Sequence, residues 1–173
     1  MNGKSAAKFL AGIAASAAAF VAAGGTAAAE PRSQSGSPAV LLVRDNYDSG
    51  TKAIMAQASH GNARAQTTLG FMYEYGRGVP QNYVTAVYWY QRAAEQGNPD
   101  GQYQLGLMYE KGHGVSQSDT LAYMWLNLAA GHAAPSVRDY FAHVRDAVAN
   151  KLTPAQMGDA QWLALNFVPK TSQ

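Results

Sequence analysis

The sequence contains no cysteine among its 173 residues, and this absence excludes several kinds of site at once. A chain without a thiol has no cysteine nucleophile, no dithiol redox pair and no cysteine-based zinc site. It also forms no disulfide, so the packing of its side chains must hold the fold together.

Apart from its N-terminus, the chain also lacks an excess of basic residues over acidic ones. The formal net charge is +2, and Lys4 and Lys8 account for both of these positive charges. The remainder of the chain carries 11 basic and 11 acidic residues and is formally neutral. Its charge therefore gives no reason to expect a nucleic-acid partner.

The N-terminus lacks an apolar run long enough to cross a membrane. The run over residues 9–23 is rich in alanine, whereas a membrane-spanning helix needs about 20 strongly apolar residues. Two lysines precede this run and Ala27-Ala28-Ala29 follows it, a pattern typical of a secretory signal peptide that is cleaved before Glu30. We expect residues 1–29 to be removed, leaving a periplasmic or secreted protein with no membrane insertion.

The stretch that begins at Glu30, EPRSQSGSPAVL, is rich in Ser, Pro and Gly. This composition is typical of a flexible spacer, which we assign to residues 30–44. Removal of residues 1–29 leaves 144 residues, enough for one domain with its own core.

Beyond the spacer, the chain repeats itself at an offset of 36 residues. The stretch MYEYGRGVPQ at residues 72–81 returns as MYEKGHGVSQ at 108–117. A repeat period between 20 and 50 residues indicates a solenoid of stacked units. Further pairs at the same offset are Gly61/Gly97, Leu69/Leu105, Gly70/Gly106, Ala86/Ala122, Trp89/Trp125, Ala93/Ala129 and Ala94/Ala130.

Within each unit, apolar residues recur every three or four positions, which predicts two amphipathic helices joined at the glycine stretch. The expected hairpins join 63–75 to 82–95, and 99–111 to 118–130. We interpret Gly76 and Gly112 as left-handed residues that end the first helix of each hairpin. A phosphate-binding loop is the alternative, but the third glycine and the preceding strand of a dinucleotide fingerprint are missing.

The flanking segments complete a stack. Residues 45–60 supply a partial unit before the full units 61–96 and 97–132, so the repeats cover 45–133. Residues 134–168 contain two further helices, 136–150 and one from Pro154 to about Phe167, the second opened by a capping box. We expect this pair to close the C-terminal end of the core.

The pattern G-x-x-x-A-x-x-x-L-G-x-x-Y-x-x-G-x-G-V, followed by A-x-x-W-x-x-x-A-A-x-x-G, resembles the Sel1-like repeat family, a relative of the tetratricopeptide repeats. The resemblance implies an all-α solenoid of helix hairpins. It also implies an adaptor or regulator that binds a protein or peptide of the cell envelope, without catalysis or cofactor. The first unit carries Ala65, Leu69, Gly70, Tyr73, Gly76, Gly78, Val79, Ala86, Trp89, Ala93, Ala94 and Gly97, whereas Gly101 replaces an alanine in the second.

Two other classes of function stay open. The S-x-x-K pattern of β-lactamases occurs at Ser5–Lys8 and Ser49–Lys52, and some cysteine-rich Sel1-like proteins are linked to that activity. However, no K-T-G follows, and Ser118-Asp119-Thr120 only partly matches S-D-N. The four histidines form no metal-binding motif, so we expect no metal site. The alternatives are an envelope enzyme acting on peptidoglycan or β-lactams, and a self-associating structural module.

The first helices of stacked hairpins line one side of a solenoid, which we expect to form a partner-binding groove. Mixed aromatic and charged residues there suit the recognition of a peptide or helix. In the alternative arrangement these residues pack on neighbouring helices or on the spacer. Counted at 100° per residue, the groove residues are Arg64, Thr67, Phe71, Glu74, Tyr75, Asp100, Tyr103, Leu107, Glu110 and Lys111.

Overall fold

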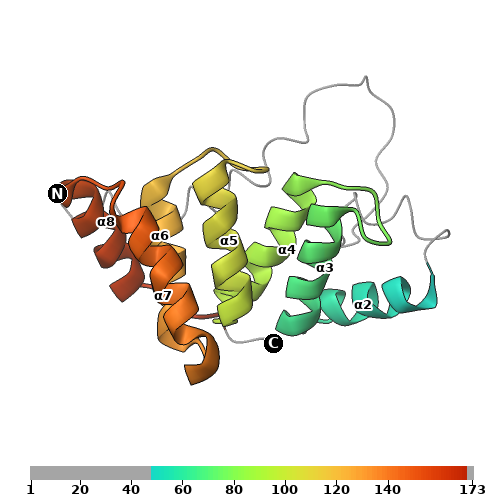
Figure 1. Cartoon of the computed structure of the whole chain (residues 1–173). Helices are drawn as coiled ribbons and strands as arrows, with labels where there is room; N and C mark the ends of the chain where they lie inside the picture. The colour runs from blue at the N-terminus through green and yellow to red at the C-terminus, as the bar shows by residue number, and fades with distance from the viewer. Residues whose placement is uncertain (1–47, 171–173) are drawn as a thin grey trace, which may run out of the picture. The chain divides into compact units, whose positions relative to one another are not determined.

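A computed structural model describes residues 48–170, and within this range the chain forms seven helices and no strand. The predicted signal peptide and spacer lie outside the described residues. The prediction of an all-α fold is confirmed. The helices are α2 (Ser49–Ser59), α3 (Ala63–Tyr75), α4 (Tyr83–Glu95), α5 (Pro99–Lys111), α6 (Asp119–His132), α7 (Pro135–Ala149) and α8 (Pro154–Leu165) (Figure 1).

The helices begin where short polar side chains can accept a hydrogen bond from a free backbone N–H of the first turn. The carboxylate of Asp48 accepts from the Thr51 amide at 2.7 Å, and this bond lowers the pKa of Asp48. Thr153 and Gln156 form the predicted capping box at the start of α8. The other N-cap side chains are those of Asn62, Asn82, Asn98 and Ser118.

The two glycine stretches are the turns of helix hairpins, as predicted. Gly76 and Gly112 follow the last residues of α3 and α5 with φ of 66° and 70°, in the left-handed region that glycine adopts without steric cost. In each turn an amide near the next helix donates back to a tyrosine carbonyl of the preceding one, Asn82 to Tyr73 at 2.8 Å and Ser118 to Tyr109 at 2.9 Å. Each turn thus brings its two helices back against each other.

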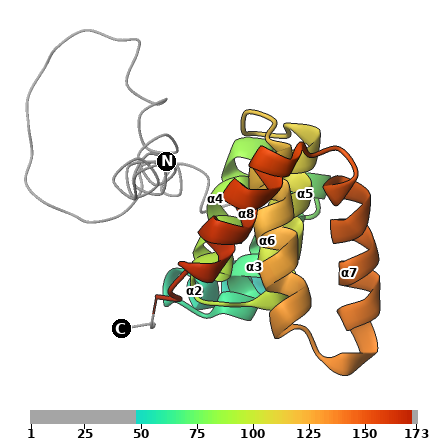
Figure 2. The ribbon, with the colours of Figure 1, turned by 90° about the vertical axis from the view of Figure 1, so that its left-hand side faces the viewer.

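The helices form two layers, with α3, α5 and α7 on one side and α4, α6 and α8 on the other (Figures 1 and 2). From α2 to α7, each helix packs on the next one in the chain. The last two helices, α7 and α8, both pack chiefly on α6. The C-terminal pair therefore closes the stack by flanking α6.

Buried leucines, alanines and aromatic residues fill the space between the layers. Leu69 and Leu105 hold equivalent positions and are each 1% exposed, while Trp89 and Trp125 are similarly buried. The helical spacing of Trp89 and Trp125 predicts core positions whose indole N–H groups find polar partners, and the second part of this prediction is wrong. Among the described residues neither Nε1 atom has a hydrogen-bond partner.

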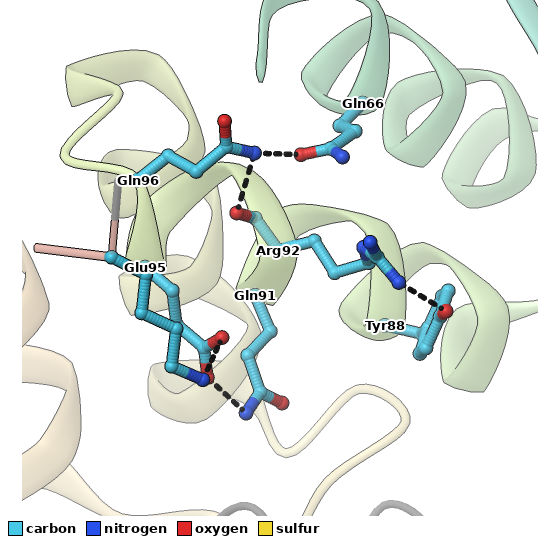
Figure 3. A network of polar contacts seen from close by, with 7 residues as sticks. Gln66, Tyr88, Gln91, Arg92, Glu95 and Gln96 are labelled. Atoms are coloured by element: carbon cyan, nitrogen blue, oxygen red, sulfur yellow. Dashed lines mark hydrogen bonds and ion pairs between the residues drawn. The ribbon is translucent and has the colours of Figure 1, made fainter. Parts of the chain in front are cut away.

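Two fully buried glutamines connect successive units in the same way. Gln66 Nε2 donates to the Ala58 carbonyl at the end of α2, and Gln102 Nε2 donates to the Ala94 carbonyl at the end of α4. The Gln66 side-chain oxygen accepts from Gln96 at 2.7 Å (Figure 3), and in the next unit His132 takes the place of Gln96. These buried amides therefore have their polar atoms paired, as burial requires.

The chain after α8 runs back across the stack to the first hairpin. The ring of Phe167 packs edge-on against Trp125, with centroids 5.3 Å apart. Lys170 then bonds to Glu95 at the end of α4 twice, amide to carbonyl and ammonium to carboxylate, each at 2.7 Å. We call residues 166–170 the C-terminal strap.

Candidate protein-binding surface

Aromatic side chains on three helices of the α3–α5–α7 layer form two groups of ring contacts, one on α3 and one between α5 and α7. In α3, the rings of Phe71 and Tyr75 lie 4.5 Å apart. In α5, Tyr103 stacks on Phe141 of α7 at 4.3 Å, and its hydroxyl donates to the Tyr140 hydroxyl at 3.2 Å. We call Phe71, Tyr75, Tyr103, Tyr140 and Phe141 the aromatic face.

The two ends of the aromatic face are open to solvent, while its middle is packed. Tyr75 is 52% exposed and Tyr140 is 61% exposed. Phe71 and Tyr103 are half-buried, and Phe141 belongs to the core. Large aromatic side chains held rigidly yet partly exposed supply contact area at low entropic cost, which is typical of protein-binding surfaces.

Burial and neighbouring groups raise the pKa of two tyrosines in the aromatic face. Burial raises the pKa of Tyr103, and the hydrogen bond with Tyr140 and electrostatic interaction with Tyr140 and Tyr75 raise it further. Burial also raises the pKa of Tyr75, followed by the effect of the neighbouring Glu74 carboxylate. Tyr75 and Tyr103 therefore lie within electrostatic reach across the α3–α5 boundary, and their hydroxyl groups are neutral at physiological pH.

Two cations border the aromatic face at the hairpin-turn end. The guanidinium of Arg77 lies 5.0 Å from the centroid of the Phe71 ring, in a cation–π arrangement. Lys111 is the last residue of α5, the position that Tyr75 holds in α3, and it is exposed. Both hairpin turns lie at the upper end in Figure 1, so these cations share one end of the layer.

Some of the ten residues expected to line a groove are engaged within the protein. Glu74 is 8% exposed and accepts a 2.7 Å hydrogen bond from the fully buried Tyr90. Thr67 bonds to Asn98, the N-cap of α5, at 3.1 Å. Glu110 pairs with Lys151 at 2.5 Å, and this bond raises the pKa of Lys151.

The other predicted residues lie at the surface or are half-buried. Arg64, Tyr75, Asp100 and Lys111 are exposed. Phe71, Tyr103 and Leu107 are half-buried, and of these Tyr103 is covered in part by α7. Their assignment to a partner-binding site stays a prediction.

Three members of this surface, Tyr140, Phe141 and Arg77, were not among the groove residues expected from the sequence. Tyr140 lies in α7, which does not follow the 36-residue offset, so a comparison of units could not place it. Arg77 lies in the glycine stretch, outside both helices of its hairpin. An arginine two residues after an aromatic helix end was the available signal for it.

The other candidate sites from the sequence are structural or exposed in the described part of the chain. The Ser49–Lys52 motif forms the first turn of α2, where Ser49 and Lys52 are exposed, and the Ser5–Lys8 motif lies outside the described residues. Ser118 Oγ accepts from the Leu121 amide as the N-cap of α6. Within residues 48–170, no three potential metal-binding side chains gather, and no helix has the length and apolarity to span a membrane.

A pocket of about 400 Å³ lies between α6 and α8, away from the aromatic face. It is open to solvent and mixes polar with apolar residues. Its walls are formed by Asn127, Leu128, Gly131, His132, Gln161, Ala164 and Leu165. None of the residues predicted to bind a partner lines it.

Comparison with known families finds two Sel1 repeats in the chain, at residues 63–98 and 99–132. These ranges begin at the first residues of α3 and α5, so each repeat contains one helix hairpin. No curated protein matches the sequence.

The solved structures similar to the chain include the following two. A protective antigen present in uropathogenic Escherichia coli strains, which displays an SLR fold, is 29% identical and superposes with a TM-score of 0.64. The match covers 71% of this chain but only 26% of the antigen, so this chain spans about a quarter of that protein's length. A Sel1 repeat protein from Oxalobacter formigenes is 39% identical over 52% of this chain and 68% of that protein, with a TM-score of 0.48.

Proposed function

Because the chain belongs to the Sel1 repeat family, we propose that it is an exported adaptor or regulatory protein that docks a protein or peptide partner of the cell envelope. Sel1 repeats generally mediate protein–protein interactions, and proteins built from them are typically non-catalytic scaffolds. The proposed mechanism is therefore docking, without turnover and without a cofactor.

The exposed ends of the aromatic face carry this proposal. Tyr75 and Tyr140 expose more than half of their surface, yet Phe71 and Tyr103 hold them in place by ring contacts. A pre-ordered aromatic surface loses little side-chain entropy when a partner binds, so more of the contact energy is available as affinity.

Export rests on the N-terminal pattern of residues 1–29 alone. Expression with the native N-terminus, followed by fractionation and intact-mass measurement, tests it. We expect the protein in the periplasm or the medium with a mass that starts at Glu30. A full-length product that stays in the cytoplasm would remove export from the proposal and leave the docking function to be judged separately.

A double variant, Tyr75→Ser with Tyr140→Ser, tests the docking surface. Both side chains are largely exposed, so we expect the free energy of unfolding to change by less than about 1 kcal/mol. Crosslinking and pull-down from envelope extract should recover a partner with the wild type and lose it with the double variant.

Leu165→Ser provides the matched control. Leu165 is 86% exposed on α8, away from the aromatic face, so this variant also removes an exposed apolar side chain. We expect it to retain the partner. If both variants lose the partner, the interaction depends on exposed apolar side chains in general. If both variants keep it, the docking surface lies elsewhere.

A further inference from the structure

The geometry points to an acidic segment as the occupant of the aromatic face, and this inference rests on the proposed docking function. We propose that Arg77 and Lys111 recognise Asp or Glu side chains that flank an aromatic or aliphatic residue in an extended stretch of the partner. The aromatic face would hold the apolar residue, and the two cations would bind the carboxylates beside it.

The two cations have no carboxylate partner of their own in the described part of the chain. Ion pairs there join Arg145 to Asp146, Lys151 to Glu110 and Lys170 to Glu95. Both Arg77 and Lys111 are exposed, and neither belongs to these pairs. Their charges therefore remain available to a partner.

The carboxylates of α3 and α5 at this end of the layer are already engaged. Glu74 accepts from Tyr90 inside the hairpin, and Glu110 pairs with Lys151. Asp100 is exposed but lies in the first turn of α5, 11 residues before Lys111, which is roughly 16 Å along a helix. That distance exceeds the screening length of about 8 Å at physiological salt, so Asp100 does not neutralise Lys111.

Arg77 is arranged to bind a carboxylate beside an aromatic ring. Its guanidinium lies over Phe71, which limits its motion, while its side-chain N–H groups make no hydrogen bond to the residues that the structure describes. A guanidinium presents five donors in a planar fork that matches a carboxylate in bidentate geometry. An acidic residue next to an apolar one in the partner would meet Arg77 and Phe71 together.

A display library of random peptides of about a dozen residues, each fused through its C-terminus, tests the inference. Such peptides carry no free C-terminal carboxylate, so any acidic selection reports side chains. Selection on the purified protein should enrich peptides in which Asp or Glu flanks an aromatic or aliphatic residue. A selected peptide should bind about tenfold more weakly to Arg77→Gln, because a charge-assisted hydrogen bond is lost, and also to Lys111→Gln.

Arg92→Gln is the matched control, because Arg92 also stacks on a tyrosine, Tyr88, but in the opposite layer (Figure 3). It should bind the selected peptides as the wild type does. Enrichment of apolar peptides without acidic residues would overturn the inference while leaving the docking function intact. If the Tyr75→Ser, Tyr140→Ser double variant enriches the same peptides as the wild type, both the inference and the docking function are overturned. Enrichment of sequences that occur in this chain would indicate self-association and would also overturn both.

Discussion

At the scale of single residues, Gly70 shows how the absence of one methyl group sets the distance between two helices. A Cβ atom at this position would lie 2.6 Å from the ring of Tyr90 in α4. Glycine inside a helix costs about 1 kcal/mol relative to alanine, and the contact with Tyr90 offsets this cost. A Cβ atom at Gly106 would lie 2.8 Å from the Leu126 side chain in the second hairpin, so both repeats depend on the same close approach.

Gly70→Ala should therefore destabilise the protein by about 1–3 kcal/mol, since the added methyl group forces α3 and α4 apart. Gly158→Ala is the control, because a Cβ atom at this position in α8 meets nothing within 4 Å. The control should be neutral or more stable by up to about 1 kcal/mol. Urea denaturation measures both values, and equal effects of the two substitutions would contradict the packing argument.

The hydrogen bond from Tyr90 to Glu74 predicts a loss of stability at alkaline pH. Burial raises the pKa of Tyr90 above its ordinary value of 10.0, and the hydrogen bond to Glu74 raises it further. The resulting stabilisation is present below pH 10 and is lost as the pH rises above 10, because the unfolded chain ionises first.

Tyr90→Phe should lower the free energy of unfolding by about 1–3 kcal/mol at pH 8, since Glu74 loses its donor. Between pH 8 and pH 11 the wild type should lose more stability than this variant. Tyr88→Phe, at a half-buried position, should change stability little and keep the pH dependence of the wild type. An identical pH dependence in wild type and Tyr90→Phe would exclude Tyr90 as its source.

The fate of the predicted groove residues shows what a helical wheel can determine. Tyr75 and Lys111, the last residues of α3 and α5, are exposed. The helical wheel also placed Glu74 on the groove side, but in the structure its carboxylate accepts a hydrogen bond from the hydroxyl of Tyr90 inside the hairpin. Tyr90 is replaced by Leu126 in the second unit, so the repeat pattern gave no sign of a polar pair there.

At the scale of elements, the helix boundaries were predictable because side chains and glycines mark them chemically. The expected helices 63–75 and 99–111 coincide with α3 and α5, since Asn caps precede them and left-handed glycines follow. The buried pair Gln66 and Gln102 was missed, although the offset of 36 residues relates them. A polar side chain is not expected in the core, and these two are stable there only because the carbonyl groups at the ends of the preceding helices accept their hydrogen bonds.

The C-terminal strap could not be predicted, because its contacts join residues far apart in the sequence. In a solenoid each unit normally contacts only its neighbours. The strap instead connects the end of α8 to the end of α4 through Phe167 on Trp125 and Lys170 on Glu95. It should therefore couple the unfolding of the C-terminal helices to that of the first hairpin.

Truncation after Leu165 should lower the free energy of unfolding by about 2–3 kcal/mol, since it uncovers Trp125 and removes the half-buried Phe167. Hydrogen exchange should then show faster opening of α8 and α6 than in the wild type. Truncation after Lys170, which keeps the whole strap, is the control and should behave as the wild type. Unchanged exchange after the longer deletion would show that the strap contributes nothing to coupling.

At the scale of the whole molecule, the stack has an aromatic face on one layer and exposed apolar side chains near its C-terminal end. Trp162, Leu165 and Val168 are exposed near that end, and they are the surface on which self-association would depend. The docking function needs no such contact. Light scattering should therefore report a monomer over a wide range of protein concentration, and a concentration-dependent increase in mass that Leu165→Ser abolishes would favour the structural-module alternative.

The central claim is that the partner docks on the aromatic face, and site-specific photocrosslinking in living cells tests it most directly. A photoreactive phenylalanine analogue would replace Tyr75 or Tyr140 in one pair of variants and Leu165 in the control. We predict that the same partner is crosslinked from both aromatic positions and not from Leu165. Crosslinks to one partner from Leu165, with none from Tyr75 or Tyr140, would contradict the account.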